Sequence, residues 1–279
     1  MNPTRRVQLP AGSGAGGVEV DTVAVEEPLE IRVEGVAAAI TMRTPGDDLD
    51  LAIGFLATEG VIGADDGMGD AMGDVRAILQ VSENVVDVRL SDGVSPARAR
   101  SADRAMYATS SCGVCGKASL DRILRGRSTR LAAVAPPDTL LARLPAAFDA
   151  AQVHTHATGC MHAAALFSLS AALVAAPDPE PIILLAREDV GRHNAVDKVL
   201  GARLRSERMA PEPVGEPFDG LGLVVTSRAG FEVVQKAVTV GIGVVCTVGA
   251  PTSLAIDLAR ESGCVLIAWL REGRWRRYA

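Results

Sequence analysis

The second half of the chain alternates short apolar runs with amphipathic stretches, and this alternation constrains the fold more than any other feature. PIILLARED is such a run, and GRHNAVDKVLGARLRSE after it puts four apolar residues on one helical face: Val196, Val199, Leu200 and Leu204. LGLVVTS, GVVCTVG and CVLIAWL are predicted as further strands, with helices RAGFEVVQKAV and TSLAIDLARESG between them. Strands that alternate with helices predict an α/β layer with a mixed or largely parallel sheet and flanking helices.

The segments that follow these strands are polar or rich in glycine. They are AREDVGRHN, TSRAG, VGAPTS and WLREGR, and three of the four contain arginine. Ligands of α/β sheets collect at the carboxyl ends of strands, so this pattern indicates an anionic ligand. In the first segment Arg192, His193 and Asn194 crowd a helix start, which favours ligand binding or acid–base chemistry as much as a helix cap. For Asp197 and Lys198, further along, a cap with solvated charges is a sufficient explanation.

The first half is predicted to be richer in strands. EEPLEIRVEGVAAAITMRTPGD contains two extended stretches around a glycine turn, which predicts a hairpin, and VRAILQVSENVVDVRLSDG predicts another strand pair. Between them DLDLAIGFLATEGVI has the spacing of a helix, and GADDGMGDAMGD lacks the aspartate spacing of a calcium loop. We therefore predict a flexible leader over residues 1–20, a smaller β-rich region over 21–125 that ends in a cysteine-containing loop, and an α/β domain over 126–279.

Composition argues against several classes of partner. The formal charge of −6 and the aromatic content of 3% argue against nucleic-acid binding, because phosphate backbones attract cationic surfaces and single strands stack on aromatic rings. The charge-free run 237–256 is long enough to cross a membrane, but its glycines, proline and hydroxyls favour a buried strand followed by a turn and a helix start. The N-terminus lacks the apolar region of a signal peptide, so we expect a cytoplasmic protein without membrane contact, whose five cysteines are reduced.

Cys112 and Cys115 lie three positions apart in TSSCGVCGKASL, with Gly113 and Gly116 next to them and a helix-like segment after them. A helix N-terminus favours the thiolate and glycines permit a mobile backbone, so the pair has the properties of an attacking sulfur. The same spacing also suits a redox pair, or half of a zinc site that Cys160 and His162 would complete. Two further cysteines stand in apolar stretches and are expected to be small core residues: Cys246 and Cys264.

Longer motifs occur along the chain in this order: EEPLEIRVEG, MRTPGDDLDLAIGFLATEGVI, TSSCGVCGKASL, TGCMHAAALF, REDVGRHNAVDKVLG, EVVQKAV, APTSLAIDLA and WLREGRWRRY. Through these motifs, from about residue 26 onward, the chain resembles the FdhD family, the sulfur carrier proteins required for active formate dehydrogenase. TSRAGFE departs from the SGRASFE form of that family, because Gly230 stands where the form has its second serine. Arg228, Phe231 and Glu232 are retained.

The resemblance implies a sulfurtransferase. A cysteine desulfurase would pass sulfane sulfur to the loop that holds Cys112, the persulfide carrier, and Cys115. The protein would then deliver the sulfur to the molybdenum cofactor before that cofactor enters formate dehydrogenase. The cofactor, in its bis(molybdopterin guanine dinucleotide) form, is a bound client, and no permanent metal is expected. The resemblance further implies a cytidine-deaminase-like second half and a homodimer.

The resemblance also implies where the guanine nucleotide portion, or a GDP-like nucleotide, makes contact: Trp269, Leu270, Arg271, Glu272, Gly273 and Arg274. Arg192, His193 and Arg228 at the other strand ends supply groups that a pyrophosphate-rich cofactor needs, so 126–279 is the expected cofactor-binding domain. The alternative function is a zinc-binding scaffold or interaction protein with four ligands: Cys112, Cys115, Cys160 and His162. Near-stoichiometric zinc that is lost on Cys→Ser substitution would favour that alternative.

Overall fold

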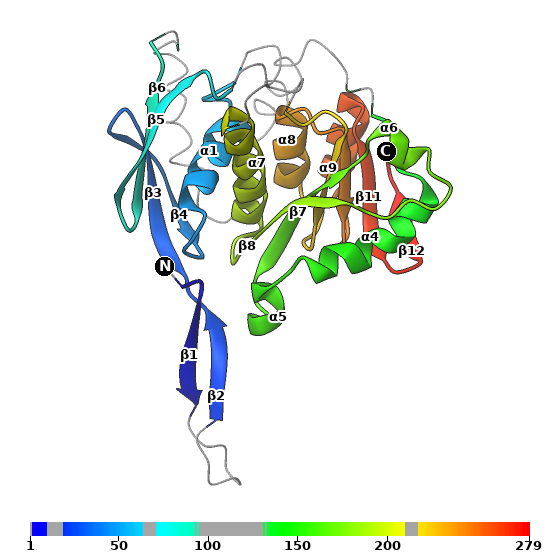
Figure 1. Ribbon diagram of the computed structural model, residues 1–279, viewed down its shortest axis with the longest axis horizontal. Helices are drawn as coiled ribbons and strands as arrows, with labels where there is room; N and C mark the ends of the chain where they lie inside the picture. Colours follow the sequence, from blue (N-terminus) through cyan, green and yellow to red (C-terminus); the bar gives the residue numbers. More distant parts are fainter. Residues whose placement is uncertain are drawn as a thin grey trace.

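The computed structural model describes residues 2–9, 19–63, 71–92, 94, 131, 133–209 and 217–279. Cys112 and Cys115, the predicted boundary between residues 125 and 126, and most of the GADDGMGDAMGD stretch lie outside these residues. The described residues form a six-stranded sheet, a four-stranded sheet and a two-stranded ribbon, with helices packed on the two larger sheets (Figure 1). The predicted class, a mixed α/β fold with flanking helices, is confirmed.

The six-stranded sheet contains the strands predicted for the second half. In the order β12-β11-β10-β9-β7-β8, it comprises β7 (His162–Ser168), β8 (Ile183–Asp189), β9 (Leu221–Val225), β10 (Val244–Thr247), β11 (Val265–Arg271) and β12 (Arg274–Arg277). β9, β10 and β11 pair in parallel, β7 is antiparallel to both β8 and β9, and β12 is antiparallel to β11. It follows that β8, β9, β10 and β11 run in one direction and end at the same edge of the sheet.

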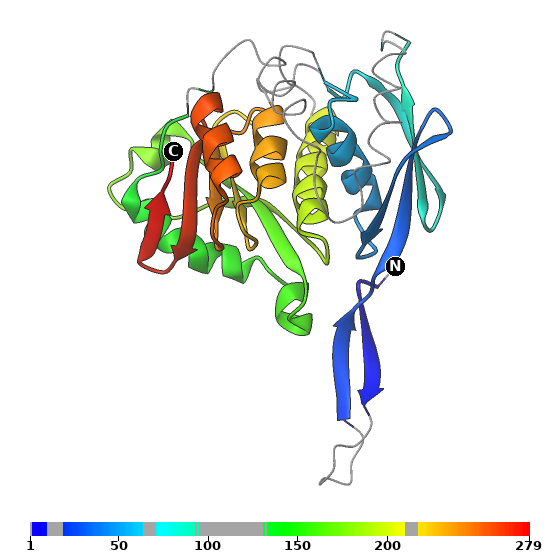
Figure 2. The same cartoon turned by 180° about the vertical axis from the view of Figure 1, so that it is seen from behind.

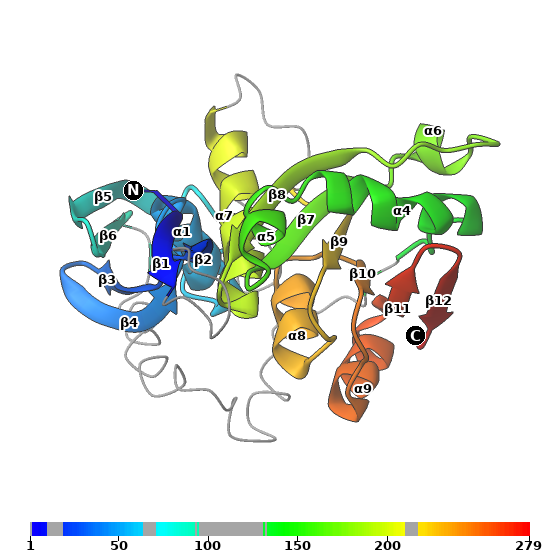
Figure 3. The same ribbon diagram turned by 90° about the horizontal axis from the view of Figure 1, so that it is seen from below.

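Helices cover both faces of this sheet (Figure 3). α4 (Asp138–Ala150) lies on one face, where its buried leucines pack against residues of β9, β10 and β11. α7 (Arg192–Met209), α8 (Phe231–Thr239) and α9 (Ser253–Ser262) cover the other face. The four apolar residues predicted to share a face of α7 are all buried. The short helices α5 (His154–Thr158) and α6 (Ala171–Val174) precede and follow β7 in the chain.

The four-stranded sheet holds both hairpins predicted for the first half. In the order β4-β3-β6-β5, its strands are β3 (Glu27–Val33), β4 (Val36–Arg43), β5 (Val75–Ser82) and β6 (Val85–Leu90). β3 and β4 form one antiparallel pair, β5 and β6 form the other, and β3 lies parallel to β6. The predicted helix between the hairpins is α1 (Asp48–Thr58), which packs against α7.

α1 and α7 approach each other closely because glycines stand where they cross. A Cβ on Gly201 would lie 1.9 Å from the carbonyl oxygen of Asp50, and one on Gly54 would lie 1.8 Å from that of Asp197. One continuous hydrophobic core therefore extends from the four-stranded sheet through α1 and α7 to the six-stranded sheet.

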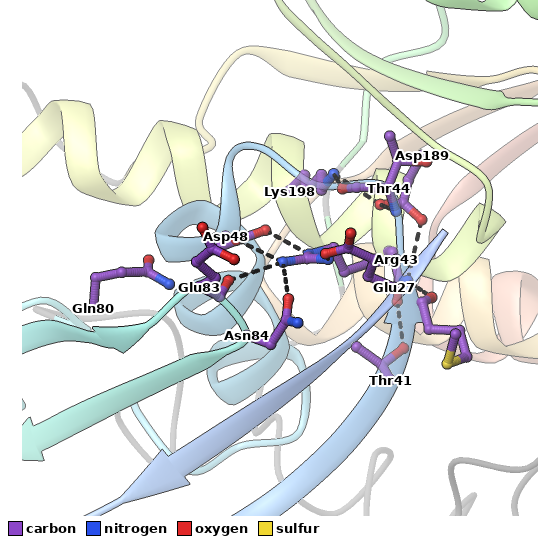
Figure 4. A network of polar contacts seen from close by, with 12 residues as sticks. Glu27, Thr41, Arg43, Thr44, Asp48, Gln80, Glu83, Asn84, Asp189 and Lys198 are labelled. Atoms are coloured by element: carbon purple, nitrogen blue, oxygen red, sulfur yellow. Dashed lines mark hydrogen bonds and ion pairs between the residues drawn. The ribbon is translucent and has the colours of Figure 1, made fainter. Parts of the chain in front are cut away.

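Buried ion pairs connect the same parts of the molecule (Figure 4). Arg43, at the end of β4, is fully buried, and its guanidinium donates to Asp48 at 2.8 Å. The backbone N–H of Thr44 donates to the carboxylate of Asp189 at 3.0 Å, and the ammonium of Lys198 lies 2.7 Å from the same carboxylate. Lys198 is only 1% exposed, so its charge is neutralised in the interior.

This corrects the explanation of Asp197 and Lys198 as solvated cap charges. Asp197 is 2% exposed and lies 2.9 Å from the ammonium of Lys236 on α8. Each of the two α7 charges therefore meets an opposite charge from another element, Asp189 at the end of β8 for Lys198 and Lys236 on α8 for Asp197. A buried charge is tolerated when it is paired and hydrogen-bonded in this way.

The start of the chain differs from the flexible leader expected over residues 1–20. β1 (Thr4–Leu9) pairs antiparallel with β2 (Glu19–Ala24), and the ribbon that they form extends beyond the rest of the molecule (Figure 2). α5 lies against β2. The two strands satisfy each other's backbone hydrogen-bonding groups, which a short polar sequence with two arginines does not reveal.

The charge-free run 237–256 forms the end of α8, then β10, a turn and the start of α9, as its glycines and hydroxyls predict. Every helix in the described residues is too short or too polar to cross a lipid bilayer.

Candidate functional site

The residues predicted to bind a cofactor all lie at the edge where β8, β9, β10 and β11 end, but in separate groups. Trp269 to Arg274 form the turn between β11 and β12 and the residues beside it. Arg192 and His193 follow β8, and Arg228 follows β9. β8 and β11 are four strand positions apart in the sheet, which at the usual strand spacing is about 19 Å. The structure therefore brings these residues to one edge without bringing them into one contact cluster.

The residues at the β11–β12 turn surround a cavity of about 670 Å³, which among the described residues is lined by Trp269, Arg271, Gly273, Arg274, Trp275 and Arg276. Small-molecule sites typically occupy about 300–1,000 Å³, so the cavity has a suitable size for a nucleotide. Leu270 is buried in the core, and neither it nor Glu272 lines the cavity, although both belong to the predicted segment. Trp275 and Arg276, which the prediction omits, contribute because β12 folds back beside β11.

The cavity is cationic. Arg271 and Arg274 are direct cross-strand partners in the β11–β12 pair, and like charges in such positions repel each other. Neither of them, nor Arg276, forms an ion pair with any other residue that the structure describes. Guanidinium groups bind phosphate oxygens in a bidentate manner, so an anionic ligand would relieve the repulsion.

Trp269 has an unusual backbone conformation. Its φ of +58° lies in the left-handed region, which costs a bulky residue about 1–2 kcal/mol. The pairing with β12 shifts register between Ala268 and Arg271, and the Trp269 N–H donates to the carbonyl of Gly249 at 3.2 Å. The residue is 40% exposed where it lines the cavity. Irregular pairing of this kind re-aims a side chain next to a site, and an exposed indole is suited to stacking on a base.

The ends of β9 and β10 meet between the two groups. Arg228 is exposed, and Gly249 packs against its backbone, since a Cβ on Gly249 would lie 2.9 Å from the Cα of Arg228. Gly230 is the N-cap residue of α8 and has no side chain with which to cap this helix. A serine at this position, as in the related SGRASFE form, would cap α8, so glycine leaves a first-turn N–H uncapped at a cost of roughly 0.3 kcal/mol.

The second group lies where α7 begins. Arg192 and His193 form its first turn, and His162 at the start of β7 has its Nδ1 3.5 Å from the hydroxyl of Thr226. Burial, and then the charge of Arg192, lowers the pKa of His162. Burial, and then the cations Lys236 and Arg192, lowers the pKa of His193 to about 4. At neutral pH both imidazoles are therefore uncharged, and each can accept a hydrogen bond or a proton.

The remaining polar residues of REDVGRHN have structural roles. The carboxylate of Glu188 accepts backbone hydrogen bonds at the start of α5, from Val153, His154 and Thr155. Burial by itself would raise the pKa of Glu188, but these N–H groups outweigh it and the pKa is lowered. Asn194 donates to Asp189 at 3.2 Å and to the Met42 carbonyl at 2.7 Å. These bonds fix the strand end and leave Arg192 and His193 for a ligand.

Two charged residues of α8 belong to the second group although the prediction of binding residues omits them. The carboxylate of Glu232 lies 3.8 Å from Nε2 of His193. One helical turn later, Lys236 pairs with Asp197. On α7, His193 and Asp197 are four residues apart, and on α8, Glu232 and Lys236 are four residues apart, so the two helices face each other through these residues. This shared spacing is the signal that sequence analysis could have used.

The structure describes three of the five cysteines. Cys246 and Cys264 are buried, as predicted, although Cys264 stands just before β11 rather than within it. Burial raises the pKa of both thiols, that of Cys264 to about 12, so both are poor nucleophiles. Cys160 is exposed. In the described ranges no three His, Cys, Asp or Glu side chains are placed to hold a metal ion. The full zinc set lies partly outside those ranges, because Cys112 and Cys115 do.

The chain is similar to proteins of one family over nearly its whole length. The sequence model of the FdhD/NarQ family matches residues 24–279. A relative from Anaeromyxobacter dehalogenans, named sulfur carrier protein FdhD, is 42% identical over 291 residues, with 99% of this chain and 95% of the relative covered. A protein of the same name from Streptomyces avermitilis is 44% identical over 283 residues, with 99% and 93% covered.

A solved structure has the same fold. It is the crystal structure of a protein from Desulfotalea psychrophila that was provisionally assigned as a formate dehydrogenase accessory protein. The two structures superpose with a TM-score of 0.66, and the match covers 98% of this chain and 95% of that chain. At 21% identity, this likeness establishes the fold alone.

Proposed function

The chain belongs to the FdhD/NarQ family, and from that premise we propose that it is a sulfur carrier required for active formate dehydrogenase. The single observation that carries the proposal is the family match over residues 24–279. Relatives that are 42% and 44% identical, and that align over almost the full chain, bear the name sulfur carrier protein FdhD.

Cys112 is the proposed sulfur acceptor and a cysteine desulfurase the proposed donor. The Cys112 thiolate attacks the outer sulfur of a persulfide on the donor. The new S–S bond forms as the donor's S–S bond breaks, and the donor cysteine leaves as a thiolate, so the exchange needs no outside oxidant or reductant. The position of Cys112 beside Gly113 and before a helix-like segment supports this role. Cys115 has a supporting role, because one thiolate suffices to carry one sulfur.

The proposed recipient of the sulfur is the molybdenum cofactor in its bis(molybdopterin guanine dinucleotide) form, bound as a client at the strand-end edge. In the β11–β12 cavity Trp269 would stack on a guanine base while Arg271 and Arg274 bind phosphate oxygens. Further along the same edge stand Arg228 and Arg192, neither of which forms an ion pair with another described residue. An extended anionic ligand would therefore meet cations over a span of about 19 Å.

The carrier is further proposed to act in the cytoplasm as a homodimer, loading the cofactor before it enters formate dehydrogenase. Its transient partners are then the desulfurase, the cofactor and the apoenzyme.

Mass spectrometry after loading tests the proposal. The purified protein is incubated with a cysteine desulfurase and cysteine, then digested without reductant, and added sulfur is mapped to each cysteine. We expect one or more additional sulfur atoms on Cys112, and none on Cys246 or Cys264. Loading that is unchanged in Cys112→Ala would refute the assignment of the acceptor.

A further inference from the structure

The first turns of α7 and α8 face each other at the middle of the strand-end edge. His193 is in the first turn of α7 and Glu232 in that of α8, and the His193 Nε2 lies 3.8 Å from a carboxylate oxygen of Glu232. One turn further along, Asp197 of α7 and Lys236 of α8 are 2.9 Å apart. We call Asp197 and Lys236 the inner pair, and His193 and Glu232 the outer pair. Because residues four apart share a helix face, the inner pair fixes the register in which the outer pair meets.

The inner pair is rigidly held. Asp197, Lys236 and Thr58 are 2%, 5% and 1% exposed. The hydroxyl of Thr58 donates to Asp197 at 2.9 Å and accepts from the ammonium of Lys236 at 2.9 Å. Burial by itself would lower the pKa of Lys236, but Asp197 and Glu59 outweigh it and raise the pKa, so the cation persists. The register of α7 against α8 at this level is therefore set by packing and does not depend on a ligand.

His193 and Glu232, by contrast, form no hydrogen bond with a side chain among the described residues. The Nε2 atom of His193 is buried and has no hydrogen-bond partner in that part of the chain. The carboxylate of Glu232 accepts no hydrogen bond from any residue that the structure describes, the N–H groups of its own helix included. Unsatisfied buried polar atoms are rare in folded proteins and call for a specific explanation. Since His193 is neutral at pH 7, one of its ring nitrogens is an acceptor, and in the tautomer that carries the proton on Nδ1 this acceptor is Nε2, beside the carboxylate of Glu232.

Two adjacent acceptors, with the charge of Arg192 near enough to act on His193, suit a ring edge that presents two donors beside an acceptor. A 2-amino-4-oxopyrimidine presents an amino group and a ring N–H, both donors, beside a carbonyl oxygen that accepts. Glu232 and His193 would accept from the two donors, and Arg192 would donate to the carbonyl. We propose that Arg192, His193 and Glu232 bind the 2-amino-4-oxopyrimidine ring that pterin and guanine share.

This inference rests on the proposed function, because the proposed client contains both rings. The ring site lies at the starts of α7 and α8, which follow β8 and β9, and the Trp269 cavity lies at the end of β11, two to four strand positions away, or about 10–19 Å. The two sites would hold two parts of one client.

Calorimetry tests the inference by comparing the binding of two pairs of compounds, each of which differs only in the 2-amino group of the ring. Pterin is compared with lumazine, which carries an oxo group in place of the 2-amino group, and GDP is compared with IDP, which lacks that amino group. We expect the protein to prefer the amino compound by at least about tenfold in one of the pairs, as a site built around an N–H donor does. The pair that shows the preference identifies the ring as pterin or guanine.

The matched variants are Glu232→Gln and Glu261→Gln. The first should weaken binding of the preferred amino compound by about 10- to 100-fold, as expected when one hydrogen bond to a charged group is lost. The second, exposed on α9, should leave binding unchanged. Equal affinity within both pairs, no binding of any of the four compounds up to millimolar concentration, or a preference that survives Glu232→Gln would overturn the inference.

Binding at the β11–β12 cavity, to which the proposed function assigns the guanine base, is measured separately. Both tryptophans of the chain line it, so quenching of their fluorescence by GDP reports occupancy of the cavity alone. An amino-group preference that depends on Glu232, without quenching, would support the ring site and count against the cavity. Quenching without such a preference would do the reverse.

Discussion

Replacing Lys236 by methionine removes the cation of the buried pair while keeping a side chain of similar length. The Lys236 and Asp197 side chains are 6% and 3% exposed, and the ammonium lies 2.9 Å from both the Asp197 carboxylate and the Thr58 hydroxyl. Without the ammonium, Asp197 stays in the interior without a counter-charge. We expect Lys236→Met to lower the free energy of unfolding by about 3–5 kcal/mol, the usual cost of breaking a buried pair.

The loss of stability caused by Lys236→Met depends on pH, and the direction of this dependence follows from the pKa of the Asp197 carboxyl group. Burial raises the pKa of Asp197 in the folded protein, against the opposing effect of Lys236 and Thr58, and loss of Lys236 raises it further. A carboxyl group whose folded pKa exceeds its unfolded value, about 3.9, destabilises the fold as the pH rises from the lower value to the higher. The destabilisation caused by Lys236→Met is therefore smaller near pH 5 than at pH 8.

Urea unfolding followed by circular dichroism measures the loss by linear extrapolation. The melting temperature should fall by about 6–20 °C, at 2–4 °C per kcal/mol for a chain of this size. Asp197→Asn combined with Lys236→Met removes both charges and keeps an acceptor for Thr58, and it should recover at least half of the loss. A loss below about 1 kcal/mol, as for an exposed pair, or a double variant no more stable than the single one, would refute the reasoning.

Three further outcomes follow from the packing and the cavity. The pKa of Cys264 is about 12, against an ordinary value of 9.0, so at pH 7 it has about a thousandfold less thiolate than an ordinary cysteine. Iodoacetamide should therefore label the exposed Cys160 long before Cys264, and equal rates would contradict this. Gly201→Ala places a Cβ 1.9 Å from a carbonyl oxygen and should lower the free energy of unfolding by about 1–3 kcal/mol. Unchanged stability of this variant would disprove the reasoning. Arg274→Ala should weaken GDP binding by about 1.5–3 kcal/mol in tryptophan quenching, and unchanged affinity would move the nucleotide site elsewhere.

Most strands and helices could be predicted because their apolar residues repeat with a clear period. The face of α7 was predictable from four residues at helical spacing, all of which are buried. β7 was not assigned as a strand, because HAAALFS is buried at nearly every position and a continuous apolar run does not distinguish strand from helix. β1 was missed because pairing with β2, not an apolar pattern, makes it a strand.

The location of the candidate site was predictable from the direction of the strands and from the types of residue that follow them. Strands that alternate with helices bring their ends to one edge, which places Arg192, Arg228 and Arg274 there without any knowledge of side-chain contacts. The buried pair of Asp197 and Lys236 was not predictable, since the two residues are 39 positions apart and a charge on a helix usually faces solvent. Whether it does so is decided by tertiary packing.

Transfer of labelled sulfur tests the central claim most directly. The protein is loaded with ³⁵S from labelled cysteine and a desulfurase, separated from the donor, and mixed with molybdenum cofactor and apo formate dehydrogenase. Radioactivity in the cofactor and formate oxidation are then measured together. We predict that label and activity appear in proportion with the wild-type protein and are both absent with Cys112→Ala. Formate dehydrogenase that becomes equally active with Cys112→Ala, or active without acquiring label, would contradict the account.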